Sequence, residues 1–340
     1  MGYIQSKADY SLFSKIGTRG RTIVVVHVDD IIIAEDDLNS INSLKYMMNE
    51  RFKLKDLARL RYILGIELAT SKDGIFLSQK KYLLNILHET GHMGVKPCET
   101  PMEQHIKLDN EKGDILKDLN HYRKVIEKLL YLTITRPNIV HTIHILSQFM
   151  SQPRVPHKEA INRLLKYLKG TARYGVMMSS EGPIHLKAYC DSDWASCPMT
   201  RRSTCGYCTM IGNSPITWKT KKQTIVSRSS AEAEYRSMAL TTCELIWLKA
   251  LLKDLGIVHK EPMTLFCDNQ AAMHIAANPV FHERTKHIKI DCHVVRNGDI
   301  QTQFVSTTKQ VADMFTKPLG REALQNLRSK LALGNPGVST

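Results

Sequence analysis

The stretch YCDSDWA, residues Tyr189–Ala195, places carboxylates at the end of a predicted strand. Three further acids stand in similar settings. Glu234 lies early in a predicted helix, Asp268 closes the predicted strand TLFC, and Asp313 opens the predicted helix ADMFTK. Four acids at the ends of secondary-structure elements predict a metal site formed by Asp191, Glu234, Asp268 and Asp313.

The chemistry of such a cluster follows from its charge. Carboxylates that lie close together repel one another, and they stay ionised together only when cations neutralise them. Oxygen-only ligands suit Mg²⁺ or Mn²⁺. Two such ions, about 3.5 to 4 Å apart, can activate a water and stabilise the leaving oxygen in phosphodiester hydrolysis. We therefore expect two Mg²⁺ (or Mn²⁺) ions as cofactors.

Six motifs surround the four acids. They are TRRSTCGY (200–207), PITWKTKKQ (215–223), SRSSAEAEYRSM (227–238), FCDNQAA (266–272), NPVFHERTKHI (278–288) and QVADMFTKPL (310–319). Together they resemble the ribonuclease H of copia-type LTR retrotransposons. The resemblance implies a fold that gathers one acid each from the first strand, the first long helix, the fourth strand and the last helix. It also implies hydrolysis of the RNA strand of RNA/DNA hybrids.

The beginning of the chain carries a second resemblance. RTIVVVHVDDIIIA, residues 21–34, predicts two β-branched strands joined by a turn at Asp29 and Asp30. It is similar to the paired-aspartate hairpin of reverse transcriptases, with His27 in place of the usual tyrosine. A polymerase needs a third metal-binding aspartate from an earlier strand, and Asp9 is the only earlier acid. We predict that Asp29 and Asp30 are a relic polymerase site that catalyses nothing.

The hydrophobic pattern changes once along the chain. Residues 75–178 read as mainly helical, with apolar residues three and four positions apart. From Ile184 the pattern switches to three strands and then one long helix. We predict a boundary at 179–183, with a truncated reverse transcriptase palm, thumb and connection remnant over 1–180. A ribonuclease H-like domain, a mixed sheet with flanking helices, is expected over 184–333, so the fold class is α+β followed by α/β.

Three of the acid assignments have alternatives. Asp193 lies two residues beyond Asp191, and a continuing strand would place both on one face; we favour Asp191. Ser229 and Glu232 have the spacing of a helix capping box, so Glu232 is expected to be structural and Glu234 functional. Asp268 alone could equally be a helix cap.

The charge of the chain points to a polyanionic partner. Lys and Arg number 47 against 33 Asp and Glu, which gives a net charge of +14, and both halves are basic. A basic surface that serves only solubility is the alternative. We expect the nucleic acid to contact residues around Trp218, namely Arg201, Arg202, Lys219, Lys221, Lys222 and Arg228.

Cysteine usage and hydropathy bear on the cellular compartment. The eight cysteines lie mostly in apolar contexts with no secretory signal before them, so we expect reduced thiols in an intracellular, cytoplasmic or nuclear protein. Cys205 and Cys208 form a single CxxC, which we do not interpret as a zinc site because positions i and i+3 of a strand face opposite sides. No apolar run reaches the length of a membrane span.

The sequence is compatible with three functions. The leading hypothesis is a fragment of a copia-type Pol polyprotein whose ribonuclease H cleaves RNA/DNA hybrids and whose polymerase activity is lost. The alternative is a catalytically silent module that binds nucleic acid, and metal dependence of cleavage separates the two. An integrase-like strand transferase shares the fold family, but the motifs TRRSTCGY and RTKHI disfavour it. The resemblance also implies other retrotransposon Pol or Gag products as partners.

Overall fold

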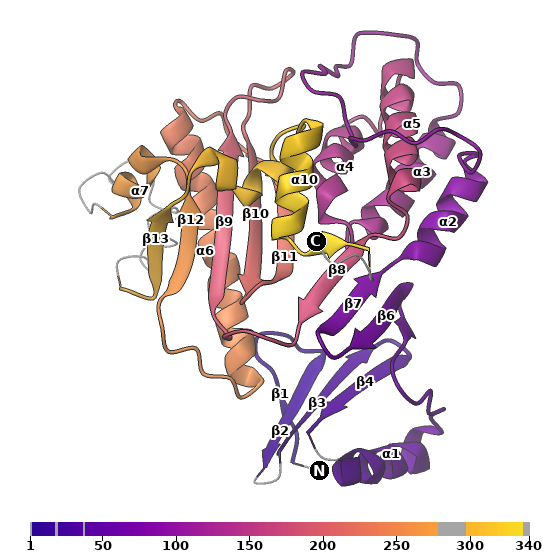
Figure 1. Ribbon diagram of the computed structural model, residues 1–340, viewed down its shortest axis with the longest axis vertical. Coiled ribbons are helices and arrows are strands. Elements are labelled where there is room, and N and C mark those ends of the chain that lie inside the picture. The colour runs from indigo at the N-terminus through magenta and orange to yellow at the C-terminus, as the bar shows by residue number, and fades with distance from the viewer. Residues whose placement is uncertain (1, 18–19, 37, 278–296, 336–340) are drawn as a thin grey trace. The chain divides into compact units, whose positions relative to one another are not determined.

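The computed structural model describes residues 2–17, 20–36, 38–277 and 297–335 (Figure 1). The motif NPVFHERTKHI therefore lies outside the described residues. Within the described part, no helix has both the length and the apolar character needed to cross a bilayer.

Contacts along the chain divide it into two compact units. The first contains Met1–Arg61 and Glu244–Glu261, and the second contains Tyr62–Cys243 and Pro262–Thr340. This division differs from the expected domains of residues 1–180 and 184–333, whose boundaries stay a prediction.

The first unit is built on a four-stranded antiparallel sheet. Its strands follow the chain order β1 (Ile4–Gln5), β2 (Leu12–Gly17), β3 (Gly20–His27) and β4 (Asp30–Glu35), and α1 (Leu38–Phe52) comes next. The predicted hairpin is present, but its turn is at Val28 and Asp29 rather than at Asp29 and Asp30, because Asp30 pairs with His27 and begins β4. Val28 has a φ of 51°, a left-handed conformation that a β-branched residue rarely adopts.

The second half of α6 (Ser230–Asp254) belongs to this first unit. The carboxylate of Asp254 accepts hydrogen bonds from Ser6 Oγ at 2.7 Å and from the main-chain N–H of Lys7 at 3.0 Å. The bond from Ser6 lowers the pKa of Asp254. Trp247 Nε1 donates to the carbonyl of Ala8 at 2.9 Å. The N-terminal strands are therefore completed by residues almost 250 positions later in the chain.

A five-stranded mixed sheet carries the candidate site in the second unit. β9 (Leu186–Asp193), β10 (Thr204–Ile211) and β11 (Ser214–Lys222) form the predicted antiparallel meander. The long helix α6 then leads to β12 (Met263–Cys267), which pairs parallel with β9, and β13 (Ile300–Phe304) pairs parallel with β12. The sheet order 11-10-9-12-13 places the first strand in the centre (Figure 1). This arrangement confirms the predicted mixed sheet with flanking helices.

The helices predicted over 75–178 are also confirmed. They are α2 (Lys80–Glu89), α3 (Leu119–Leu132), the 3-10 helix η1 (Pro137–Ile139), α4 (Val140–Ser147) and α5 (Val155–Gly170). A second sheet accompanies them, in the order β14 (Leu333–Gly334), β8 (Gly175–Ser179), β7 (Gly74–Ser78), β6 (Ile66–Ser71) and β5 (Tyr62–Ile63).

One apolar core joins these helices to the mixed sheet. It contains Leu129 of α3, Ile143 of α4 and Leu164 of α5 together with Cys208 and Met210 of β10, and all are at most 3% exposed. Burial of such side chains contributes about 1.5 to 3 kcal/mol each. The core therefore crosses the expected boundary at 179–183.

The last helix begins later than the sequence predicted. Asp313 does not open the predicted helix ADMFTK but lies on the 3-10 helix η4 (Val311–Phe315), and α10 (Arg321–Lys330) follows after a break. Pro318 explains the break, because proline lacks the N–H that would continue a helix and restricts the residue before it.

The shared core predicts the behaviour of a chain cut between Gly182 and Pro183, where the loop is exposed. A protease site inserted there should be cleaved, and the two pieces should still elute together in gel filtration without denaturant. Both pieces contribute to the core. The uncut insertion variant is the control, and separate elution of the pieces under native conditions would contradict the shared core.

Candidate metal centre

Asp191 lies near the end of β9 and is 1% exposed. Its main-chain carbonyl accepts a hydrogen bond from Ser237 Oγ of α6 at 2.8 Å. Its carboxylate accepts one from Thr316 Oγ1, and Lys317 Nζ lies 3.3 Å from Asp191 Oδ1. Asp191 is thus held between α6 and the residues that follow η4.

The two glutamates at the start of α6 have different roles. Glu232 accepts a hydrogen bond from the Arg228 N–H at 2.8 Å, and its own N–H donates to Ser229 Oγ at 3.1 Å. These are the bonds of a helix cap, as the spacing predicted. Glu234 is 5% exposed and accepts from the Ser192 N–H of β9 at 2.9 Å. It therefore reaches across to the strand that carries Asp191.

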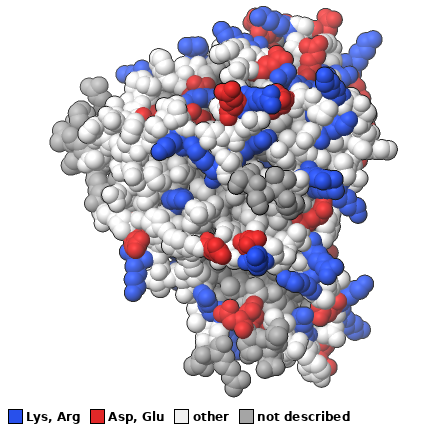
Figure 2. Space-filling model, in the orientation of Figure 1, with Lys and Arg blue, Asp and Glu red and all other residues white. Residues whose placement is uncertain are grey.

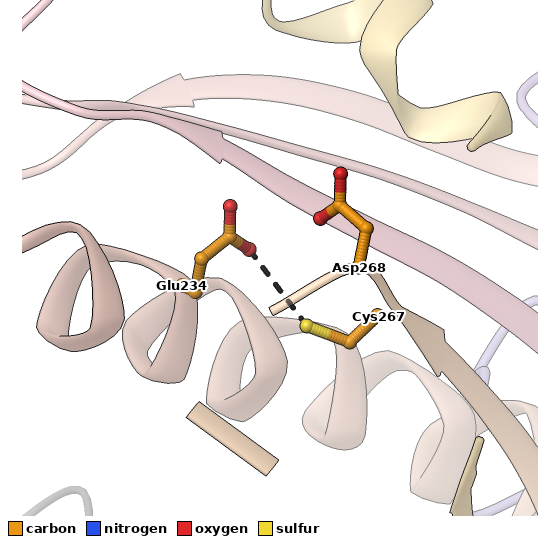
Figure 3. A group of neighbouring side chains, drawn as sticks. All are labelled: Glu234, Cys267 and Asp268. Atoms are coloured by element: carbon orange, nitrogen blue, oxygen red, sulfur yellow. Dashed lines mark hydrogen bonds between the residues drawn. The ribbon is translucent and has the colours of Figure 1, made fainter. Parts of the chain in front are cut away.

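Asp268 connects the four acids. One carboxylate oxygen each from Asp191, Asp268 and Asp313 lie within 4.8 Å of one another. A second group consists of one oxygen each from Glu234 and Asp268 and the sulfur of Cys267, and these atoms also lie within 4.8 Å of one another (Figure 3). The structure therefore brings Asp191, Glu234, Asp268 and Asp313 together through Asp268, while Asp193 belongs to neither group of described residues.

Burial and mutual repulsion shift the protonation of these acids. Burial, and then the charge of Asp191, raise the pKa of Glu234 to about 10. The same two causes raise the pKa of Asp313 to about 6 and also raise the pKa of Asp268. Carboxylates respond in this way when they lose hydration beside a like charge. A cation at this site would remove the reason for the acids to hold protons.

A lysine supplies one such positive charge. Lys317 Nζ lies 2.8 Å from Asp313 Oδ1 as well as 3.3 Å from Asp191 Oδ1. Burial alone would lower the pKa of Lys317, but the carboxylates of Asp191 and Asp313 outweigh it and raise that pKa. Sequence reasoning missed Lys317, although its position four residues after Asp313 is a signal for a pair on one helical turn.

A glycine opposite Asp191 lets η4 approach the sheet. Gly206 of β10 pairs with Asp191. A Cβ atom at Gly206 would lie 2.7 Å from Phe315 Cβ and 2.7 Å from Thr316 Cγ2. Thr220 Oγ1 of β11 adds a hydrogen bond of 2.6 Å to the carbonyl of Phe315. The glycine of TRRSTCGY therefore makes room for the segment that carries Asp313, Thr316 and Lys317.

The donor set has the chemistry of a divalent-cation site. Asp191, Asp268 and Asp313 offer carboxylate oxygens alone, which is the set that Mg²⁺ and Mn²⁺ prefer. Lys317 already lies between two of these carboxylates, which means that the site attracts positive charge.

Comparison with known proteins identifies the family. The reverse transcriptase (RNA-dependent DNA polymerase) family model matches residues 1–104. The retrovirus-related Pol polyprotein from transposon RE1 of Arabidopsis thaliana is 42% identical over 98% of this chain. The chain belongs to the Pol polyproteins of copia-type retrotransposons. It spans 23% of the length of the RE1 polyprotein.

This chain covers a small part of one further relative and nearly all of another. The Pol polyprotein from transposon TNT 1-94 of Nicotiana tabacum is 32% identical over 95% of this chain and 25% of the relative. An uncharacterized mitochondrial protein of Arabidopsis thaliana is 39% identical over 67% of this chain and 94% of the relative. Among solved structures, a foamy viral protease-reverse transcriptase with double-stranded DNA aligns with 84% of this chain and 46% of that one, at 12% identity and a TM-score of 0.48.

The aspartates of the N-terminal hairpin, Asp29 and Asp30, are exposed, unlike Asp191 and Glu234. Asp29 is exposed in the turn between β3 and β4, and Asp30 is exposed at the first position of β4. Among the described residues, neither group of potential metal ligands includes them.

The strand β11 directs its basic residues to both faces of the sheet. Lys219 and Lys221 are exposed, whereas Lys222 Nζ donates to Gln148 Oε1 at 2.6 Å. Trp218, on the same face as Lys222, is half-buried and donates to a main-chain carbonyl after α3. Lys219 and Lys221 therefore lie on the opposite face of the strand from Trp218 and Lys222.

The remaining basic residues lie in loops. Arg201 and Arg228 are exposed and Arg202 is half-buried. Figure 2 shows Lys and Arg spread over the visible face, with acidic side chains between them. The nucleic-acid contacts of these residues stay a prediction.

Gly206→Ala should destabilise the second unit by about 1 to 3 kcal/mol, because the added methyl group overlaps Phe315 and Thr316. Denaturant unfolding measures the loss. The control is Gly94→Ala, since a Cβ atom at Gly94 meets nothing within 4 Å. Equal unfolding free energies for the two variants would contradict the close approach of η4.

Lys317→Met should lower the melting temperature without divalent metal, because Asp191 and Asp313 lose their neutralising partner. An unsatisfied buried polar group costs roughly 1 to 3 kcal/mol. Mg²⁺ should then raise the melting temperature more in this variant than in the unmodified chain. The exposed residue Lys309 supplies the control Lys309→Met. An identical Mg²⁺ response in all three proteins would show that Lys317 and the metal do not share these carboxylates.

Proposed function

We propose that residues 184–333 of this Pol segment hydrolyse the RNA strand of RNA/DNA hybrids with two Mg²⁺ or Mn²⁺ ions. One observation carries the proposal. Asp191, Glu234, Asp268 and Asp313 come from four separate elements and meet through Asp268. Asp191, Glu234 and Asp313 are buried and Asp268 is half-buried, and such convergence of acids is costly unless the site binds cations.

The roles of the protein groups follow from how each is held. Asp191 is held by Thr316 and lies with Asp268 and Asp313, so these three carboxylates would be ligands of an ion. Glu234 is fixed by the Ser192 N–H and joins Asp268 on the other side. The ions would activate a water and stabilise the leaving oxygen of the phosphodiester. The residues themselves orient the ions and exclude other ligands.

The proposed substrate has one ribose strand and one deoxyribose strand. A protein distinguishes RNA from DNA through the 2′-hydroxyl and the groove shape that it imposes. Exposed cations near the start of α6, such as Arg228, and on β11, such as Lys219 and Lys221, would hold the phosphate backbone. Single-stranded RNA and duplex DNA should be poor substrates.

We do not assign polymerase activity to this segment. Metal-assisted polymerisation needs several carboxylates around the same ions, and Asp29 and Asp30 are exposed with no third acid grouped with them among the described residues.

Lys317 favours a second candidate, the silent nucleic-acid-binding module. Its ammonium group already neutralises Asp191 and Asp313, so these acids can stay buried without any metal. A chain of this kind would bind hybrids through its basic residues and cleave nothing.

Glu234→Gln should reduce hybrid cleavage about 100-fold or more, because the amide keeps the size but removes the charge that holds an ion. Metal assistance contributes several kcal/mol, and about 1.4 kcal/mol is a factor of ten in rate. The matched control is Glu232→Gln, which alters only the helix cap. The measurement is Mg²⁺-dependent cleavage of a labelled RNA/DNA hybrid by the full chain.

Equal activity in Glu232→Gln and Glu234→Gln would refute the site assignment. Absence of metal-dependent cleavage by the unmodified chain, with retained and salt-sensitive hybrid binding, would support the silent module instead.

A further inference from the structure

Two cysteines stand directly behind the candidate centre. Cys190 precedes Asp191 on β9, and Cys267 precedes Asp268 on the neighbouring parallel strand β12. Both are 0% exposed. The thiols of Cys190 and Cys267 interact with each other.

The sulfur of Cys267 faces a catalytic candidate. Cys267 Sγ lies 4.0 Å from Glu234 Oε2, and the dashed line in Figure 3 marks this contact. Donor atoms of Glu234, Cys267 and Asp268 all lie within 4.8 Å of one another. Two carboxylates and a thiol within this distance can surround one ion after small side-chain movements.

One oxygen of the Glu234 carboxylate, Oε2, points toward the sulfur of Cys267. Its Oε1 atom accepts a good hydrogen bond from the Ser192 N–H, at 2.9 Å. Among the described residues, the partner of Oε2 is the thiol of Cys267, which is a weak donor at 4.0 Å. Glu234 is 5% exposed, so a buried oxygen with only a weak partner points at Cys267 and Asp268. A buried oxygen of this kind is normally paired more strongly.

We propose that Glu234, Cys267 and Asp268 form a second metal site, which takes thiophilic divalent ions such as Zn²⁺ or Cd²⁺. Thiolate ligands favour these softer ions, whereas Mg²⁺ takes oxygen ligands. Binding forms a metal–sulfur bond and releases the thiol proton of Cys267 to solvent, with no change of oxidation state. Three protein ligands leave a fourth tetrahedral position for water.

The second site shares its ligands with the oxygen-only centre. Asp268 belongs to both groups of donor atoms. A thiophilic ion bound to Cys267 therefore withdraws Asp268, and with it Glu234, from the ions proposed for hydrolysis. It follows that Cd²⁺ or Zn²⁺ inhibits Mg²⁺-dependent cleavage; this consequence rests on the proposed function, but the binding does not.

Cadmium titration of the full chain tests the binding directly, through the ultraviolet charge-transfer band of a cadmium–thiolate bond. In Cys267→Ala, the absorbance of this band at saturation should fall by the amount that one bound Cd²⁺ per chain contributes in the unmodified protein. The matched control is Cys208→Ala, because Cys208 is also 0% exposed but lies in the apolar core of the same sheet. Other thiols of the chain contribute equally to all three titrations.

Two further variants keep the test decisive if Cys267→Ala unfolds. Cys267→Ser retains the size and should also lose the band, and Glu234→Gln should weaken Cd²⁺ binding at least about tenfold while Glu232→Gln leaves it unchanged. Indistinguishable titrations of the unmodified chain and the folded Cys267 variants would overturn the site.

Inhibition is measured separately, as the Cd²⁺ concentration that halves Mg²⁺-dependent hybrid cleavage. This concentration should rise at least about tenfold in Cys267→Ala and stay unchanged in Cys208→Ala, each compared with its own uninhibited rate. If the Cd²⁺ band depends on Cys267 but neither the unmodified chain nor its variants cleave the hybrid, the metal site is supported and the proposed hydrolysis is refuted. If Cd²⁺ inhibits cleavage equally in Cys267→Ala and Cys208→Ala, the two metal sites do not share ligands.

Discussion

The structure around β9 depends on the electrostatic cost of Asp191. This carboxylate is almost fully buried beside two other aspartates, and bringing like charges together out of water is unfavourable. Three features offset that cost: the hydrogen bond from Thr316, the ammonium group of Lys317, and the proton that Glu234 retains when its pKa rises to about 10. The segment after β13 is placed where it can deliver two of these three. The need to neutralise Asp191 therefore explains why η4 lies against the sheet and why β10 has a glycine there.

Helix α6 has a different task at each end. In its first turn, Glu234 reaches the N–H of Ser192 at the end of β9. In its last turn, Asp254 accepts hydrogen bonds from Ser6 and Lys7. The N-terminal strands thus depend for these hydrogen bonds on the C-terminal part of α6.

The sequence predicted the parts of this structure that rest on local chemistry. Alternating and helical apolar patterns located the meander and α6, and capping-box spacing distinguished Glu232 from Glu234. It failed where distant segments meet. The partnership of Lys317 with Asp191 spans 126 residues, and the contact of Gly206 with Phe315 spans a similar length. The assignment of Asp313 to the start of the last helix was wrong, because Asp313 lies on the 3-10 helix η4 and Pro318 interrupts the segment before α10 begins.

The two sets of acids in this Pol segment separate the presence of residues from the presence of a site. Asp29 and Asp30 keep the sequence of a polymerase hairpin and even its turn, but they lie in water, where their charges are hydrated and need no partner. The acids around Asp191 are costly to bury, and the surrounding residues neutralise, orient and shield them. The surroundings of the second set, rather than its four acids alone, are the physical reason to propose the activity for the C-terminal half.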